Sequence, residues 1–351
     1  MKCPLIFILC ICFLHVHAQN GLEDFRQLTI HNISRLDSSE ALLPAMKEDT
    51  ATANRLAELS YQFAFNEAEK SVKLGQQGVL LSNHLGYKKG TAHNNQSLGW
   101  GLWGVGDYTK ALQRAFLSLR LYEALKDRQG ITIAYYMIAN IYRDIGDYKK
   151  ALLNAEIGLE MSEPVSVQGL IGAGIIGSIY ELNNQMDSAN FFVRKAIEIN
   201  KTLKGATWGW LYQLQGDRCR KIKQYDSAMY YYRFALPLVQ FKDIIETYNG
   251  IALTYKETNN LDSSIFYANE VLQKWSFVSY RRGMLQAVNI LADIYKRTDR
   301  RDSVIKYLEL GLALNNSIYN RENERDVQSM AFDEQTRQDD ILRAQQQLKA
   351  N

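Results

Sequence analysis

One helical pattern recurs seven times between Thr52 and Asn316, and this repetition constrains the fold more than any single motif does. In its clearest copy, from Tyr135 to Gly158, large residues fall on one helical stripe and small residues fall at regular positions beside it. A unit of roughly 34 residues with this pattern is one helical hairpin, which cannot bury its apolar face alone. The sequence therefore predicts that the hairpins stack on one another in an array.

A small residue in the second helix of each unit sets the register of the array. Successive copies are 36 to 40 residues apart and lie at Ser71, Ala111, Ala151, Ala189, Ala228, Ser264 and Val304. Twelve residues earlier, in the first helix, lie Leu59, Gly99, Ala139, Gly177, Gly216, Ala252 and Ala292. Small side chains let two helix backbones approach closely, and overfilling such a crossing is destabilising. We therefore expect both series to be buried.

The N-terminal segment has the composition of an export signal. Residues 1–18 combine a positive start at Lys2, a short apolar run and a small-residue cleavage site ending at Ala18. We predict a cleaved signal peptide and a periplasmic or secreted protein with no membrane span after cleavage; an uncleaved N-terminal anchor is the alternative. Only Cys219 then remains in the mature chain, so no internal disulfide is expected.

Two further segments flank the array, which is predicted to span residues 52–316. Residues 19–51 are predicted to form an N-terminal cap. Residues 317–351 contain no Pro or Gly, are rich in charged residues and Gln, and are predicted to form one long exposed helix. This helix is either a frayed end or a coiled-coil stalk through which two copies form a homodimer.

Composition and motif spacing argue against several kinds of chemistry. The net charge of the 351 residues is +3, so there is no basic field for nucleic acid. Residues 99–104 and 172–177 both match Gly-x-Gly-x-x-Gly, but a dinucleotide site needs a preceding strand, and both segments fall inside a predicted first helix. No metal-ligand spacing or nucleophile–base arrangement appears, so we predict no enzyme activity, no cofactor and no metal site.

Two segments carry a resemblance to a known family. Residues Gly106–Leu112 and Gly146–Leu152 both read Gly-Asp-Tyr-x-x-Ala-Leu, and together with the aligned small residues they resemble the tetratricopeptide repeat. The resemblance implies an all-α fold, a right-handed α-solenoid of about seven helical hairpins. It also implies that the first helices line a concave face.

The resemblance further implies where a partner binds, because particular first-helix positions of such repeats face the concave groove. These positions hold Trp100, Trp103, Tyr136, Asn140, Arg143, Trp210, Gln213 and Arg220, which we predict to be partner-binding residues. Aromatic rings supply contact area, while Arg and Asn orient carboxylates or backbone amides, so the expected partner is a protein or a peptide. For Trp100 and Trp103, packing between units is an equal alternative.

The order of the segments has a resemblance of its own. An export signal, a cap, repeats and a charged helix resemble the extracytoplasmic sensor half of bacterial tetratricopeptide histidine kinases and related transcription regulators. Our first hypothesis is a non-catalytic scaffold or sensor module that binds a protein or peptide outside the cytoplasm. The alternative is the sensor half of a truncated kinase or regulator whose membrane span and output domain are missing.

Overall fold

The computed structural model describes most of the predicted array. The described residues are 40, 41, 43, 46–203, 208–239, 242–273, 280–318, 329, 330, 334, 336 and 337. The predicted signal peptide and most of the predicted cap and C-terminal helix lie outside them. Within the described ranges every regular element is a helix, and none of these helices has the length and apolar composition needed to cross a membrane.

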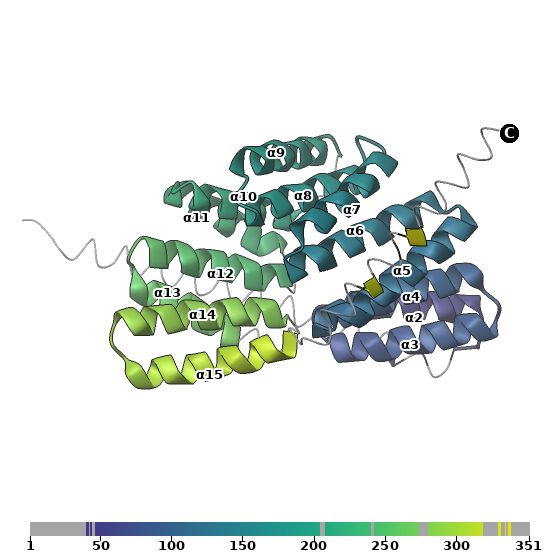
Figure 1. Ribbon diagram of the computed structural model, residues 1–351, viewed down its shortest axis with the longest axis horizontal. Coiled ribbons are helices and arrows are strands. Elements are labelled where there is room, and N and C mark those ends of the chain that lie inside the picture. Colours follow the sequence, from purple (N-terminus) through teal and green to yellow (C-terminus); the bar gives the residue numbers. More distant parts are fainter. Residues whose placement is uncertain are drawn as a thin grey trace, which may run out of the picture.

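Seven helical hairpins follow one another along the described chain (Figure 1). Their helices are α2 (Thr50–Phe63) and α3 (Ala68–His84), α4 (Lys88–Val105) and α5 (Tyr108–Leu125), α6 (Arg128–Ile145) and α7 (Tyr148–Met161), α8 (Val167–Leu182) and α9 (Met186–Thr202), α10 (Gly209–Lys221) and α11 (Tyr225–Ala235), α12 (Lys242–Glu257) and α13 (Leu261–Gln273), and α14 (Arg281–Arg297) and α15 (Arg301–Ile318). A short 3-10 helix, η2 (Leu236–Leu238), follows α11. The predicted all-α solenoid of stacked hairpins is confirmed.

The Gly-Asp steps make the tight turns of the second and third hairpins. Gly106 and Gly146 end the first helices with φ angles of 84° and 92°, a left-handed conformation that costs glycine little. The following residues, Asp107 and Asp147, cap the second helices by accepting a hydrogen bond from the backbone N–H three residues later, at 3.0 and 3.1 Å. The two-residue motif therefore ends one helix and starts the next.

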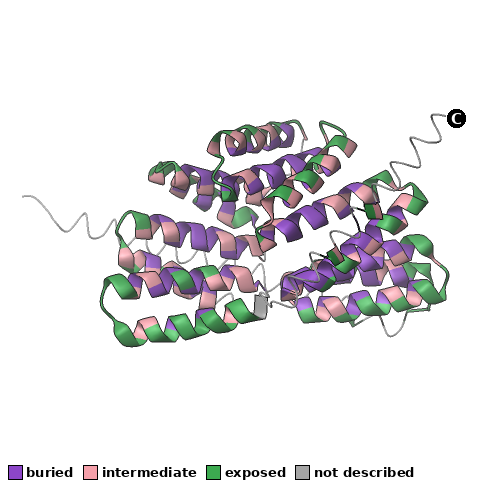
Figure 2. Ribbon diagram, viewed as in Figure 1, coloured by how far each residue is buried: buried purple, intermediate pink, exposed green. Residues whose placement is uncertain are grey.

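The aligned small residues lie where the helices cross, as the register predicts. Those of the second helices are buried from Ser71 to Ser264, and so are all seven of their first-helix counterparts. Figure 2 shows this buried interior running through the stack, whereas α15 is largely exposed. Val304 is the exception, since it is only half-buried. It belongs to the last hairpin, on which no further described hairpin packs.

Both Gly-x-Gly-x-x-Gly segments lie inside first helices, α4 and α8, where they permit close packing. A β-carbon at Gly104 would lie 1.9 Å from the carbonyl oxygen of Ala64. One at Gly174 would lie 2.2 Å from the ring of Trp210. Neither position could accept even an alanine without movement of its neighbours, so helix contact accounts for these glycines.

Ala151→Trp is expected to lower the free energy of unfolding by about 1–3 kcal/mol, because Ala151 is fully buried at a helix crossing that cannot accept a larger ring. Urea denaturation measures the change. Lys149→Trp, two residues away on an exposed position of the same helix, is the matched control and should have little effect. Equal losses for the two variants would contradict the register.

Candidate functional site

The array curves until its last hairpin touches earlier ones. A guanidinium nitrogen of Arg281, at the start of α14, donates a 2.7 Å hydrogen bond to the carbonyl oxygen of Val105 at the end of α4. The next residue, Arg282, places its Nη1 2.7 Å from Oδ1 of Asp144 in α6. A helix C-terminus exposes unpaired carbonyls and attracts cations, so Arg281 is well matched to its partner. We call these four residues the closure seam.

Because the seam joins the last hairpin to earlier ones, the concave face lines a central cavity that is partly open to solvent. This central cavity has a volume of about 1160 Å³. The first helices of all seven hairpins contribute to its lining, with Gln62, Trp100, Asn140, Ser178, Gln213, Glu246 and Asn289 as one example from each. A ligand inside it would therefore contact many repeats at once.

Seven of the eight residues predicted to bind a partner line the central cavity. They are Trp100, Trp103, Asn140, Arg143, Trp210, Gln213 and Arg220. That they bind a partner stays a prediction, but the structure brings them to one site. They come together because each lies on the first helix of its hairpin, and these helices line the concave face.

Tyr136 is placed differently from the other seven. Its side chain is 3 % exposed, it does not line the cavity, and its hydroxyl donates a 2.9 Å hydrogen bond to the carbonyl oxygen of Gln168. Its side chain occupies the space that glycines leave open, because a β-carbon at Gly158 would lie 2.5 Å from its ring and one at Gly172 would lie 2.2 Å from its hydroxyl oxygen. Tyr136 therefore fills a crossing between hairpins, and its position does not match the expected contact with a partner.

An aromatic group forms one wall of the cavity. The ring centroids of Trp100 and Trp103 are 5.1 Å apart, and Phe65 lies 5.0 Å from Trp103 in an edge-on arrangement. The Trp103 indole nitrogen donates a 3.0 Å hydrogen bond to Asp144. The two tryptophans thus pack between hairpins and also line the cavity. The two positions considered for them, between repeat units and on the concave groove, are therefore compatible.

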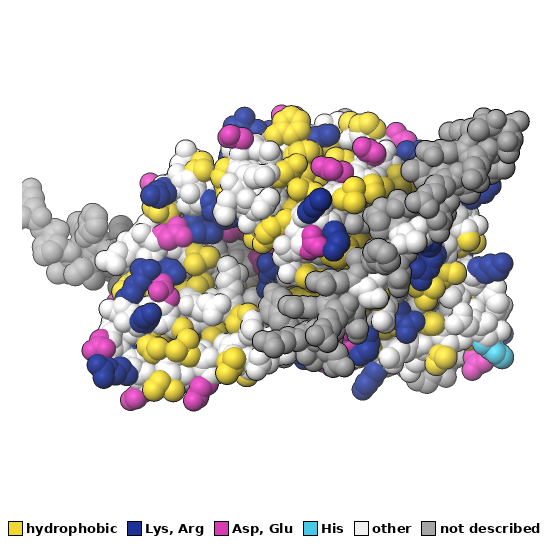
Figure 3. All heavy atoms as spheres, viewed as in Figure 1, with side chains coloured by type: hydrophobic (Ala, Val, Ile, Leu, Met, Phe, Trp, Pro, Cys, Tyr) yellow, Lys and Arg dark blue, Asp and Glu magenta, His cyan; other side chains and the backbone are white. Residues whose placement is uncertain are grey.

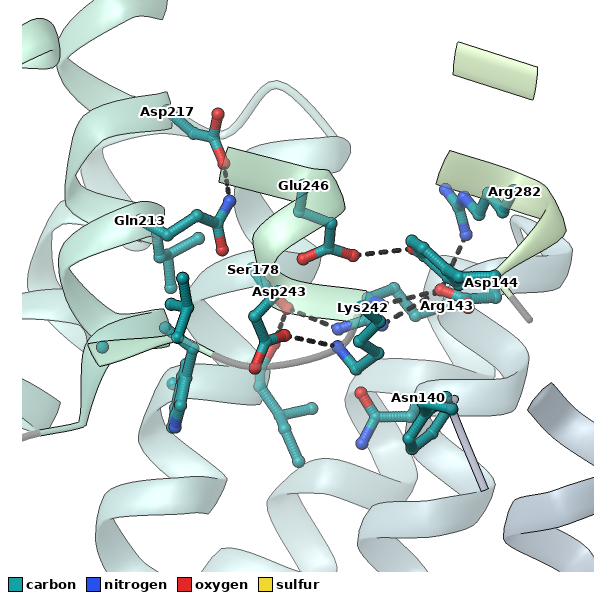
Figure 4. Close-up of a pocket in the computed structure, with 18 of the residues that line it drawn as sticks. Asn140, Arg143, Asp144, Ser178, Gln213, Asp217, Lys242, Asp243, Glu246 and Arg282 are labelled. Atoms are coloured by element: carbon teal, nitrogen blue, oxygen red, sulfur yellow. Dashed lines mark hydrogen bonds and ion pairs between the residues drawn. The ribbon is translucent and has the colours of Figure 1, made fainter. Parts of the chain in front are cut away.

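Asp144 is the centre of the polar cluster in Figure 4. Its side chain is 2 % exposed, and besides Trp103 and Arg282 it accepts a 3.1 Å hydrogen bond from Nε of Arg143. Burial alone would raise the pKa of this carboxyl, but Arg282 and Arg143 outweigh burial and hold the pKa below its ordinary value. One carboxylate therefore joins the second, third and seventh hairpins.

Lys242 extends this cluster at the start of α12. Its ammonium lies 3.0 Å from Oδ1 of Asp243 and over the rings of Phe65, Trp103 and Tyr280, at 5.7, 6.0 and 6.0 Å from their centroids. Burial would lower the pKa of Lys242, yet Asp243 and neighbouring carboxylates raise it overall. A fixed positive charge at this position links the aromatic wall to the sixth hairpin.

Two carboxyl groups on the opposite side of the cluster bind protons unusually well. Burial raises the pKa of Glu181 to about 8, and the charge of Asp217 adds to this effect. Burial also raises the pKa of Asp217 to about 6, although Arg220 acts in the opposite direction. Asp217 accepts hydrogen bonds from Gln213 and, at 2.6 Å, from the Tyr232 hydroxyl. Burial therefore favours the protonated form of both carboxyl groups on this side of the cavity.

The free energy of unfolding is expected to fall as the pH rises from about 4.5 to about 8, by up to about 5 kcal/mol. In this window the folded state keeps a proton on Glu181 that the unfolded chain has released, so a rising pH favours unfolding. Glu181→Gln should flatten the slope and be the more stable protein at pH 8. Denaturation at several pH values measures this, with the exposed Glu160→Gln as control. An unchanged slope in Glu181→Gln would be contrary to expectation.

Several cavity residues were not predicted from the sequence. Phe65, Trp208 and Tyr280 lie in links before or between helices, and Lys242, Asp243, Glu246 and Arg282 lie in the first turns of α12 and α14. They reach the cavity because the ring closes. Two charged dipeptides in the sequence could have indicated some of these residues. They are Lys-Asp at 242–243 and Arg-Arg at 281–282, each at the start of a first helix.

Comparison with known families agrees with this fold. Residues 133–156, 174–203 and 245–273 match the family model of the tetratricopeptide repeat. These segments fall in the hairpins α6–α7, α8–α9 and α12–α13. These three hairpins are thus tetratricopeptide repeats, which confirms the resemblance to that repeat seen in the sequence. No curated protein matches the chain in sequence.

Solved structures with a similar fold include one of a Rap protein and two of NprR. A Rap protein complexed with competence and sporulation factor has a TM-score of 0.58 at 11 % identity, covering 85 % of this chain and 98 % of that one. NprR in complex with its cognate peptide NprX has a TM-score of 0.58 at 12 % identity, covering 91 % and 98 %. The apo quorum sensor NprR from B. thuringiensis has a TM-score of 0.54 at 14 % identity, covering 84 % and 86 %. At such identities the likeness shows the fold alone.

Proposed function

We propose that this protein is a non-catalytic scaffold that binds a peptide, or an extended segment of a protein, in the central cavity. One observation carries the proposal: the first helices of all seven hairpins present side chains to one cavity. A ligand there contacts many repeats, so its binding energy depends on the curvature of the whole array. Binding and the shape of the superhelix are coupled for this reason.

The composition of the lining suits a peptide. The aromatic wall around Trp100 and Trp103 supplies contact area, and Asn140, Ser178 and Gln213 supply neutral donors and acceptors for backbone amides. The fold provides support by analogy, since the Rap and NprR structures contain competence and sporulation factor and the peptide NprX. A wall of this kind binds the main chain of a peptide through the polar side chains of the cavity, and binds the side chains of the peptide through the aromatic rings.

We further propose that the protein acts outside the cytoplasm as a sensor module. The signal-like composition of residues 1–18 supports this location. N-terminal sequencing of the exported protein tests it, with a mature N-terminus at Gln19 as the expected result. A chain found only in the cytoplasm would overturn the location without affecting the cavity.

A display library of random linear peptides tests the binding function directly. Peptides selected on the full chain are expected to change its tryptophan fluorescence, because Trp100, Trp103, Trp208 and Trp210 line the cavity. The double substitution Asn140→Ala and Gln213→Ala should weaken binding by at least tenfold, which corresponds to about 1.4 kcal/mol.

Lys149→Ala, at an exposed position on the second helix α7, is the matched control and should bind the selected peptides with unchanged affinity. Circular dichroism establishes that each variant remains helical. Selected peptides that bind the double variant as tightly as the original protein would place the site elsewhere. Failure to select any peptide would count against a peptide ligand.

A further inference from the structure

The outer face of the last helix carries an exposed apolar stripe. Ile305, Leu308 and Leu312 of α15 are 56, 60 and 63 % exposed. Their spacing of three and four residues places them on one side of the helix. Figure 3 shows hydrophobic side chains gathered on this surface, at the lower left of the molecule. We call these three residues the α15 stripe.

The repeat register allows the exposure of this helix face to be compared with that of the same face in the other six hairpins. Relative to the aligned small residue of each second helix, the stripe occupies positions one, four and eight residues later. In the six earlier hairpins these positions are Val72, Gly75 and Val79; Leu112, Ala115 and Leu119; Leu152, Ala155 and Leu159; Asn190, Val193 and Ile197; Met229, Tyr232 and Leu236; and Ile265, Ala268 and Leu272. Every one of them is buried or half-buried. The same positions are exposed only in the last hairpin of the described chain.

The sixth hairpin shows how such a face is covered. Ala268 of α13 is fully buried in one core cluster with Val288 and Leu291 of α14, and Ile265 packs against the same cluster. The stripe on α15 is thus the continuation of an interface that the chain forms six times internally. A terminal repeat normally has a polar outer face, because an apolar one lowers solubility.

The described part of the C-terminal segment does not cover the stripe. Glu334 lies 3.2 Å from Arg120, and Arg337 lies 3.0 Å from Glu123, both on α5. Met330 packs against the core cluster of the second to fourth hairpins. The described residues of this segment therefore lie against the array, beside α5 (Figure 1). The sequence predicted a fully exposed helix instead.

We propose that the α15 stripe is the interface of a homodimer, in which a second copy of this chain places its own α15 on it. The stripe carries no charge, so the same residues can meet across a two-fold axis without like-charge repulsion. With the axis near Leu308, Ile305 of one copy meets Leu312 of the other.

This dimer is independent of the ligand in the central cavity and can be tested without one. Light scattering of the full chain after size-exclusion chromatography is expected to give twice the mass of one chain. Leu308→Glu should weaken dimerisation at least 100-fold and give a monomer at the same concentration. Leu80→Glu replaces a leucine that is also exposed but lies on α3, and should remain dimeric.

A cysteine at the axis gives a second measurement that does not depend on the charged variant. Leu308→Cys should form a covalent dimer under oxidising conditions, because the two copies bring this position together. All proteins in this measurement begin at Gln19, so that Cys219, which is buried, is the one native cysteine, and Leu80→Cys and the unsubstituted protein should remain unlinked. A monomeric unsubstituted chain would overturn the proposal. So would a dimer that persists in Leu308→Glu, or one that Leu308→Cys does not cross-link, since the contact would then lie elsewhere.

Discussion

Asp144→Ala is expected to lower the free energy of unfolding by about 3–5 kcal/mol, the usual cost of removing one partner from a buried ion pair. The carboxylate is almost inaccessible to solvent and joins Trp103, Arg143 and Arg282 from three hairpins. Its removal leaves the guanidinium groups of Arg143 and Arg282 without their shared acceptor. Urea denaturation measures the loss, and small-angle scattering should show a larger radius of gyration because the last hairpin separates from the third.

Asp147→Ala is the matched control, because Asp147 lies three residues further on and caps α7 at the surface. Loss of an N-cap costs about 1 kcal/mol, so the two aspartates should differ clearly. The dependence of the free energy of unfolding on pH in the acid range is an independent check on the role of Asp144. Since the pKa of Asp144 in the folded protein is below 3.8, its stabilisation is present above that pH and is lost as the pH falls through the folded value. Equal losses in Asp144→Ala and Asp147→Ala would show that the seam contributes little.

The stacked hairpins could be predicted because the information for each unit is local. Turns such as Gly146-Asp147 end one helix and cap the next, and small residues such as Ala151 mark where helices cross. Such features recur at nearly constant spacing, so each copy supports the interpretation of the others. The predicted concave positions then brought Trp100, Asn140 and five other residues to one cavity for the same reason.

Closure of the ring could not be predicted from the repeats. It depends on the small rotation between successive hairpins, which accumulates over the array and leaves no mark on residue spacing. Arg282 and Lys242 therefore acquire their roles only when the last hairpins return to the second and third. The burial of Tyr136 away from the cavity has a cause in the sequence, because Gly158 and Gly172 leave a space that a large side chain fills.

Gly104→Ala and Gly311→Ala are expected to change stability in opposite directions, although both replace a buried glycine inside a helix. Alanine gains about 1 kcal/mol over glycine in a helix interior. At Gly104 a β-carbon would lie 1.9 Å from the backbone oxygen of Ala64, so the first two hairpins must separate. The cost of that overpacking, about 1–3 kcal/mol or more, exceeds the gain.

At Gly311 the nearest atom to a new β-carbon is a methyl group of Val288 at 3.4 Å, an ordinary van der Waals contact. The gain in helix propensity should therefore persist, and Gly311→Ala should be more stable than the original protein by up to about 1 kcal/mol. The two variants are expected to differ by the cost of overpacking, about 1–3 kcal/mol or more, in urea denaturation. If both were stabilising, the crossing between α4 and the turn after α2 would have room for a methyl group, and close backbone approach would no longer explain why α4 retains its glycines despite their cost.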